Sequence, residues 1–219
     1  MFFSEILNFL YKKSCLICHN KKENSFLCSK CKKEIKFNDF KVLKIIDCIN
    51  IYSCCNYSGI PQKLVRLLKF HNKKVLSTDI AKIMKEYTEF LNLDFSDFEI
   101  VCVPLHKNKK KKRGFNQCEL ISKELSKLLE IPFNFDLIKR IKNTKPMYNL
   151  KINERIENLK DAFLVEKQYF NGKKLLLIDD IITTGTTVSE IIKSLKKENI
   201  SEIVCLSFTN TDKSSINIK

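Results

Sequence analysis

Tryptophan is absent from this 219-residue sequence, and glycine and proline occur only four times each. The longest apolar run is far shorter than the roughly 20 residues that a membrane-spanning helix needs, so we expect no membrane insertion. The first thirteen residues are apolar, but they carry Glu5 and lack both a basic start and a small-residue cleavage site. They predict an amphipathic helix rather than a signal peptide.

Acidic residues are also scarce, because 25 Asp and Glu oppose 40 Lys and Arg and leave a formal net charge of +15. This excess favours anionic partners, either nucleic acid or phosphorylated small molecules. An AT-rich genome also produces a lysine excess, so charge alone does not choose between these classes. Sixteen Phe and six Tyr within a 44% hydrophobic composition suffice for the core of one medium domain, with or without a small appendage.

Cysteine, in contrast, is abundant. Four of the ten cysteines form two C-x2-C pairs separated by nine residues, namely Cys15, Cys18, Cys28 and Cys31. Two such pairs can bring four thiolates to a tetrahedral Zn²⁺, although two disulfides or four unrelated buried thiols would also fit the pattern. We expect a structural zinc ion in a module at residues 1–40 that includes the N-terminal helix, followed by a second domain at residues 41–219. This zinc spacing, together with the phosphate-binding pattern near the C-terminus, favours a reducing, cytoplasmic location.

Residues 173–195 predict a strand, a loop and a helix in succession. A nearly all-aliphatic run at residues 174–178 is typical of a buried parallel strand, and Asp179 and Asp180 follow it. The next residues are Thr183, Thr184, Gly185, Thr186 and Thr187, and an apolar helical repeat comes after them. A helix N-terminus with several hydroxyls suits a phosphate group, and paired carboxylates suit sugar hydroxyls or a divalent cation. The pattern therefore predicts a phosphorylated sugar beyond the carboxyl end of this strand.

A second predicted strand, at residues 98–103, leads into a strongly basic segment. Six of the seven residues from Lys107 to Arg113 carry a positive charge. Such a run is usually a solvated loop, but this one leaves a parallel strand at the sheet edge where the threonine loop is expected. Arg113 can engage a polyanion in a fork geometry. Phe115 is either a stacking platform for a base or a core anchor for the next helix.

The remaining periodicity completes an α/β pattern. One or two strands are expected at residues 41–58, helices at residues 59–70, 78–93 and 119–130, and a last strand at residues 203–208. We expect Phe90 on the inward face of the second helix and a frayed polar tail from Thr209 onward. The predicted fold is a mainly parallel sheet flanked by helices.

Several of these segments resemble known families. LLLIDDIITTGTT, at residues 175–187, resembles the motif that binds phosphoribosyl pyrophosphate (PRPP) in type I phosphoribosyltransferases. VPLH with RGFNQ, at residues 103–106 and 113–117, and YSGIPQKLVRLLKF, at residues 57–70, resemble the ComF family of competence proteins. The resemblance implies a type I phosphoribosyltransferase-like domain behind a small zinc-binding module.

The same resemblance implies roles for individual residues. Asp179 and Asp180 would hold the ribose hydroxyls and the loop from Thr183 to Thr187 the 5′-phosphate. Magnesium would bridge the pyrophosphate, with Arg113 as a third catalytic residue. The pyrophosphate loop would comprise Pro104, Leu105, His106 and Lys107. A further pattern of the family falls on Arg140, Thr144, Arg155, Asn158 and Phe163, although Pro146 and Met147 stand where the family has glutamine.

Two classes of function remain open at this point. ComF proteins act in natural transformation, where they handle internalised single-stranded DNA with other competence proteins on the cytoplasmic side of the uptake channel. A basic segment beside a phosphate pocket suits such a role. The alternative is a salvage or biosynthetic phosphoribosyltransferase that displaces pyrophosphate from PRPP. That activity needs a set of groups that reads one heterocycle, and the sequence alone does not reveal such a set.

Overall fold

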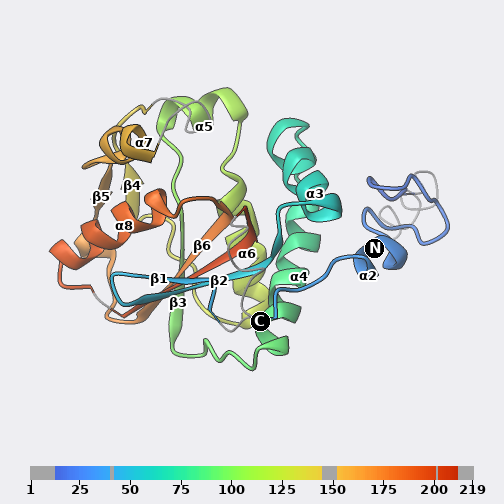
Figure 1. Cartoon of the computed structure of the whole chain (residues 1–219), viewed down its shortest axis with the longest axis horizontal. Coiled ribbons are helices and arrows are strands. Elements are labelled where there is room, and N and C mark those ends of the chain that lie inside the picture. The colour runs from blue at the N-terminus through green and yellow to red at the C-terminus, as the bar shows by residue number, and fades with distance from the viewer. Residues whose placement is uncertain (1–12, 40–41, 145–151, 201, 212–219) are drawn as a thin grey trace, which may run out of the picture.

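The computed structural model describes residues 13–39, 42–144, 152–200 and 202–211, and the expected N-terminal helix therefore lies outside the described residues. Figure 1 shows the arrangement of the elements. In chain order they are α2 (Ser29–Lys33), β1 (Lys44–Ile46), β2 (Ile49–Asn56), α3 (Gly59–Phe70), α4 (Leu76–Phe90), β3 (Phe98–Cys102), α5 (Lys107–Arg113), α6 (Gln117–Leu129), β4 (Ile138–Arg140), α7 (Ile152–Leu159), β5 (Phe163–Val165), η2 (Lys167–Tyr169), β6 (Lys174–Ile182), α8 (Thr186–Lys197) and β7 (Ile203–Asn210).

Five strands form one sheet in the order β1-β2-β7-β6-β3, and β4 pairs with β5 in a small separate sheet. The pairs β2–β7, β7–β6 and β6–β3 are parallel, and only the edge strand β1 runs antiparallel to its neighbour. This confirms the expected α/β fold with a mainly parallel sheet. Because β3 and β6 are parallel neighbours, the segments that follow them emerge at the same edge of the sheet.

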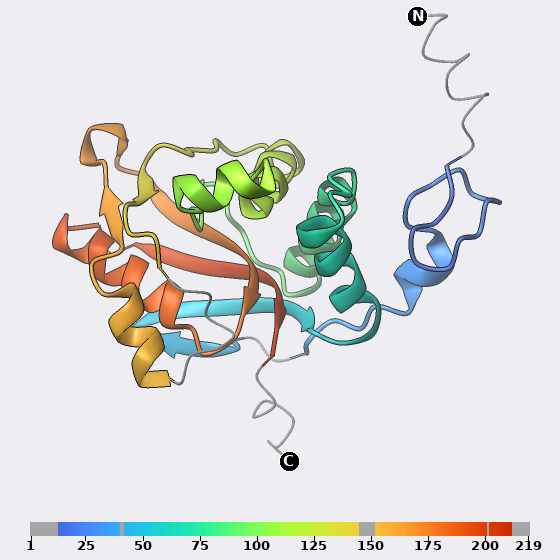
Figure 2. The same ribbon diagram turned by 90° about the horizontal axis from the view of Figure 1, so that it is seen from above.

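The sheet is buried on both faces, as its aliphatic strands predict. Leu176 and Ile178 of β6 pack in a core with α3, α4 and α6, whereas Leu175 and Leu177 pack in a second core with α8 and the β4–β5 sheet. Figure 2 shows the sheet between these two layers. The alternation along β6 has a direct consequence, since consecutive residues at its end also face different sets of helices.

Four local expectations require correction. β6 continues through Asp179, Asp180 and Ile182, because β7 pairs with it along this stretch. β7 likewise reaches Asn210, and Thr209 is fully buried rather than part of a frayed tail. The basic segment forms a helix, α5, although it has no apolar periodicity. The side chain of Phe90 is 54% exposed rather than inward-facing, because it lies at the end of α4.

The segment between the cysteine pairs and the sheet is attached to α4 and β2. The ring of Phe37 lies 5.5 Å from that of Tyr87, and the Asn38 side-chain amide donates to the Ser53 carbonyl at 2.8 Å. Lys32 of α2 forms an ion pair with Glu86 of α4. Three of the four paired cysteines belong to the same buried cluster as α3 and α4. No helix among the described residues combines the length and apolar character that crossing a bilayer requires.

Candidate functional site

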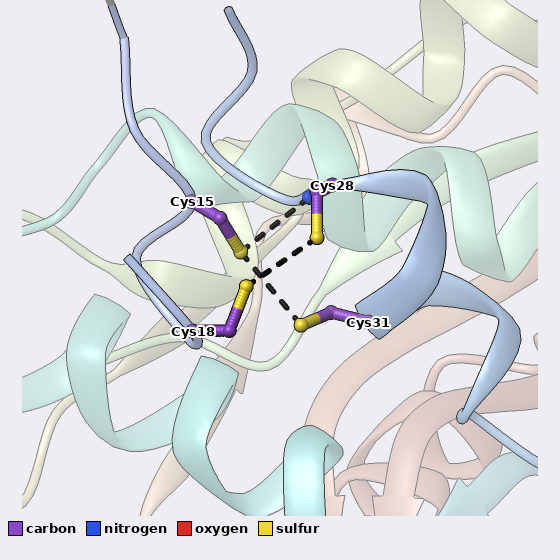
Figure 3. Close-up of side chains that lie close together, drawn as sticks. All are labelled: Cys15, Cys18, Cys28 and Cys31. Atoms are coloured by element: carbon purple, nitrogen blue, oxygen red, sulfur yellow. Dashed lines mark hydrogen bonds between the residues drawn. The ribbon is translucent and has the colours of Figure 1, made fainter. Parts of the chain in front are cut away.

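The side chains of the four paired cysteines converge, as Figure 3 shows. The Sγ atoms of Cys15 and Cys31 are 3.8 Å apart, and those of Cys18 and Cys28 are 3.6 Å apart. All four lie within 4.8 Å of one another. A tetrahedral zinc ion with Zn–S bonds of about 2.3 Å requires sulfur atoms about 3.8 Å apart, so the geometry fits. A disulfide would need about 2.05 Å, which excludes the paired-disulfide alternative in this structure.

The surroundings of Cys15 favour a thiolate. Burial opposes ionisation of its thiol, yet backbone N–H groups of Cys28, Cys18 and Ile17 outweigh this effect and lower its pKa to about 6. The N–H of Cys28 donates to Cys15 Sγ at 3.5 Å. A thiolate is the form of cysteine that binds metal. Burial and the neighbouring thiols raise the pKa of Cys31, so a single thiolate on Cys15 is favoured in the absence of a cation. By its geometry the cluster could hold a metal ion such as zinc.

A second site is a cavity of about 960 Å³ at the edge of the sheet where β3 and β6 end. This volume lies near the upper limit of the roughly 300–1,000 Å³ that is usual for small-molecule pockets. Its walls come from α3, α5, α6, β4, the end of β6 and the start of α8. The lining residues are Lys69, Phe70, Asn72, Val103, Leu105, Lys109, Lys112, Arg113, Phe115, Gln117, Arg140, Asp179, Asp180, Ile181, Ile182, Thr183, Thr184, Gly185, Thr186, Thr187 and Val188.

Asp179 and Asp180 are buried at the base of this cavity. Asp180 accepts hydrogen bonds from Lys69 Nζ of α3 at 2.8 Å and from Gln117 Nε2 of α6 at 3.1 Å. Asp179 Oδ1 accepts from the N–H of Asp180 at 2.8 Å and from the thiol of Cys118 at 3.5 Å. Cys118 and the two acids are close enough together to share a cation, but Lys69 already neutralises Asp180.

The two carboxyl groups ionise differently because of these partners. Burial, reinforced by the charge of Asp180, raises the pKa of Asp179 to about 7. Burial also disfavours the charged form of Asp180, but Lys69, Gln117 and Arg113 outweigh it and hold its pKa below the usual value. Near neutral pH the pair therefore carries between one and two negative charges, and Asp180 holds the first of them.

The threonine loop forms the adjoining wall. Gly185 has a φ of 80° and is the N-cap of α8, so the N-cap residue has no side chain that could bond the first backbone N–H groups of the helix. The positive φ favours glycine at this position, and a methyl group at Gly185 would approach Ile46 Cδ1 to 2.8 Å, so the end of the Ile46 side chain would have to shift to accept it. Lys44 Nζ donates to the carbonyl of Thr184 at 3.0 Å. This wall offers hydroxyls, free N–H groups and the positive end of a helix dipole to an anion.

Cations from α5 and β4 line another part of the cavity wall. Burial lowers the pKa of Lys109, and the positive charges of Arg140 and Arg113 lower it further. These three groups thus lie close enough to repel one another. Arg113 itself donates to Gln117. The arrangement suits a ligand with high negative charge, which would remove the repulsion.

Only part of the expected pyrophosphate loop lies at the cavity. Leu105 lines the cavity, whereas Pro104, His106 and Lys107 are not among the described residues that do so. His106 instead caps α5, since its Nδ1 accepts from the N–H of Asn108 at 3.3 Å. Phe115 is only 6% exposed and packs in the core, although part of it reaches the cavity, so it acts as the core anchor rather than as a stacking platform.

Three residues of the family pattern beyond residue 138 lie together. Arg140 donates to the hydroxyl of Thr144 and lies 5.5 Å from the ring centre of Phe163. Burial lowers the pKa of Arg140, and its Nε is buried with no hydrogen-bond partner among the described residues. Pro146, Met147 and the side chain of Arg155 lie outside the described part of the chain.

Sequence reasoning missed the residues that α3 and α6 bring to the acids. Lys69 and Gln117 lie 111 and 63 positions before Asp180 in the chain, and no local pattern links them to it. No local pattern links Phe70 and Asn72 to the acids either. The only available signal was that YSGIPQKLVRLLKF ends on Lys69 and Phe70 and that RGFNQ ends on Gln117.

Comparison with known proteins agrees with this geometry. Residues 115–215 match the phosphoribosyl transferase domain family. The chain is 35% identical to competence protein F of Haemophilus influenzae over 148 residues, which cover 64% of this chain and 63% of that protein. It is 30% identical to DNA utilization protein YhgH of Escherichia coli O157:H7 over 159 residues, which cover 70% of this chain and 68% of that protein. With competence protein ComFC of Streptococcus pneumoniae it shares 28% identity over 132 residues, or 60% of this chain and 53% of that one.

The class of protein follows from these observations: an α/β protein with a phosphoribosyltransferase domain. More particularly, the chain belongs to the ComF family of competence proteins. The aligned segment spans less than two thirds of the Haemophilus influenzae relative. A distant structural likeness to adenine phosphoribosyltransferase from Thermoanaerobacter pseudethanolicus has a TM-score of 0.35 and 13% identity, over 63% of this chain and 83% of that chain.

Proposed function

We propose that this protein binds PRPP, or a similar phosphorylated ribose, in the cavity at the end of β3 and β6. The observation that supports this most strongly is the joint presence of paired acids, a threonine loop and a cationic wall around one space. The loop from Thr183 to Thr187 would hold the 5′-phosphate at the start of α8. Asp179 and Asp180 would accept hydrogen bonds from the ribose hydroxyls.

The cationic wall would hold the pyrophosphate. Lys109 and Arg113 face the cavity, and a pyrophosphate between them and Arg140 would relieve their mutual repulsion. Magnesium would enter with PRPP, and its charge would help to neutralise the pyrophosphate. If the protein transfers the ribose, these residues would stabilise the charge of the departing pyrophosphate while the acids orient the sugar. Pro104, His106 and Lys107 would act on the pyrophosphate only through the position of α5.

We also propose that the ComF role of this protein is to handle internalised single-stranded DNA in the cytoplasm, together with other competence proteins. Its relatives are described as competence and DNA utilization proteins. The exposed lysines of α5 supply a cationic surface next to the cavity, of the kind that follows a nucleic acid backbone. In this view residues 1–40 form a structural zinc module and residues 41–219 the ligand-binding domain.

A phosphoribosyltransferase of nucleobase salvage or biosynthesis is the second candidate. The size of the cavity favours it, because about 960 Å³ leaves space beyond the acids and the threonine loop for a second ligand. Pyrophosphate release from PRPP across a panel of bases would distinguish the candidates. Pyrophosphate release with one of the bases would favour the transferase. If PRPP binds but no base leads to pyrophosphate release, the result would favour the DNA-handling role.

PRPP binding is the first test. Calorimetry with and without Mg²⁺ should show binding by the wild type. It should weaken at least about tenfold for each lost carboxylate in Asp179→Asn and Asp180→Asn, since hydrogen bonds to charged groups contribute roughly 1.5–3 kcal/mol. Asp47→Asn is the matched control, because Asp47 is exposed, lies outside the cavity and has a left-handed backbone that asparagine tolerates. A wild type that does not bind PRPP, or variants that bind it equally well, would refute the proposal.

DNA binding needs a separate measurement. A labelled single-stranded oligonucleotide, titrated at low and at physiological salt, should bind more weakly as salt rises, since Lys–phosphate contacts release counterions. Absence of binding even at low salt would exclude the DNA-handling role while leaving the PRPP site intact.

A further inference from the structure

Phe70 is an unusual aromatic side chain for its position. It is 68% exposed, the largest exposed fraction among the large hydrophobic side chains of the described residues, and it lines the cavity. The exposed rings of Phe90 and Phe135 each lie within 6.2 Å of another ring centre. Phe70 has no such neighbour among the described residues. A free ring on the wall of a polar ligand site is a ready contact surface for another planar group.

The neighbours of Phe70 connect it to the acids. Phe70 is the last residue of α3, and Lys69 beside it forms the ion pair with Asp180 at 2.8 Å. Adjacent helix residues point about 100° apart, so the contact of Lys69 with the acid leaves the Phe70 ring pointing elsewhere along the same wall. Asn72 follows in a left-handed conformation, with a φ of 54°, and also lines the cavity. Its side-chain amide offers one acceptor and two donors.

The two sides of the cavity thus differ in chemistry. α5 and β4 contribute Lys109, Lys112, Arg113 and Arg140, which suit phosphates. The end of α3 contributes an aromatic ring and a neutral amide, which suit an uncharged planar heterocycle with polar edges. Figure 1 shows α3 and α5 at the same edge of the sheet. A ligand that reached both would carry its anionic groups toward α5 and its planar group toward α3.

We propose that Phe70 and Asn72 form a nucleobase platform, in which the phenyl ring stacks on the base and the Asn72 amide bonds its edge. This inference rests on the proposed function, because it places the base beside the acids that would hold the ribose. The base can come from a free nucleobase or from a nucleotide of single-stranded DNA. Both present the same planar heterocycle, and the experiment separates them.

The absence of tryptophan provides a direct probe. Phe70→Trp keeps an aromatic ring at this position and makes it the only indole of the chain. Stacking of a base on this indole should quench its fluorescence. Three probes are titrated: a free base such as adenine or uracil in the presence of PRPP and Mg²⁺, a short oligothymidylate, and an abasic oligonucleotide of equal length. Phe135→Trp is the control, since Phe135 is 60% exposed but does not line the cavity.

Binding measurements on Phe70→Leu complete the test. This variant should bind the base-containing probe roughly five- to 150-fold more weakly, which corresponds to the loss of about 1–3 kcal/mol of stacking. Its affinity for PRPP and for the abasic strand should be unchanged. Quenching by the free base alone identifies a free nucleobase as the ligand, and quenching by oligothymidylate but not by the abasic strand identifies a nucleotide of single-stranded DNA. Either result supports the platform.

Two results would overturn it. One is the absence of quenching of Phe70→Trp by every base-containing probe. The other is equal quenching of Phe135→Trp. Calorimetry with PRPP on the same samples keeps the two ideas separate. If PRPP binds but no quenching occurs, the platform is refuted and the proposed function stands. If the wild type does not bind PRPP, the proposed function itself is refuted.

Discussion

Replacing Asp179 by asparagine should stabilise the protein, and the gain should grow with pH. Burial and the neighbouring charge raise the pKa of Asp179 from its ordinary value of 3.8 to about 7. The folded state therefore retains a proton that the unfolded chain loses above pH 3.8, so wild-type stability falls as pH rises between these two values and is level above the higher one. At high pH the buried Asp179 carboxylate therefore lowers the free energy of unfolding by about 4 kcal/mol. This value follows from a pKa difference of about 3, since each pKa unit corresponds to about 1.36 kcal/mol.

The difference between variant and wild type isolates this effect. Between about pH 5.5 and about pH 8.5, the free energy of unfolding of Asp179→Asn minus that of the wild type should increase by about 2 kcal/mol, which is the part of the penalty that develops in this window. Urea denaturation at several pH values measures it. Any effect of pH on the cysteine cluster cancels, because both proteins carry it. A constant difference across the window would refute the reasoning, whatever its size.

Two other predictions concern glycine and cysteine. Gly185→Ala should lower the free energy of unfolding by more than Gly172→Ala does. Both glycines have a positive φ, of 80° and 85°, but only the new methyl group at position 185 would contact Ile46. The left-handed conformation should cost about 1–2 kcal/mol in each variant, and equal costs in thermal unfolding would show that Ile46 moves freely away. Cys31→Ser should reduce zinc content from about one ion per chain, measured by metal analysis, whereas the exposed Cys48 should be replaceable by serine without loss. A folded, metal-free wild type would contradict this second prediction.

The sequence predicted the elements with strong periodicity and failed where pairing or distant contacts decide the structure. The helices α3, α4 and α8 and the strands β3 and β6 were expected because apolar residues recur along them. The continuation of β6 through Asp179 was not, since a charged pair interrupts the apolar run and only the pairing with β7 keeps it extended. α5 was expected as a loop, because Lys107–Arg113 contains no apolar residue to mark a helix face.

The candidate site divides in the same way. The paired acids, the threonine loop and the four cysteines were predicted because each set is contiguous or regularly spaced in the chain. Lys69 could not be assigned to Asp180, because their contact depends on how α3 crosses the end of the sheet. Phe70 and Asn72 escaped notice for a related reason, since ring exposure and backbone conformation are properties of the folded chain.

The position of β7 has a consequence for synthesis. This strand, Ile203–Asn210, is the last along the described chain, yet it lies between β2 and β6 at the middle of the sheet. While the polypeptide leaves the ribosome, the β1–β2 pair is complete long before the strand that joins it to β6, because Asn56 lies 147 positions before Ile203, whereas Ile182 at the end of β6 lies only 21 positions before it. During that interval the edge of β2 is open to chaperones and to other nascent chains. A product truncated shortly before Ile203 would lack the central strand of its sheet, so the β1–β2 pair and the β3–β6 pair would remain unpaired with each other.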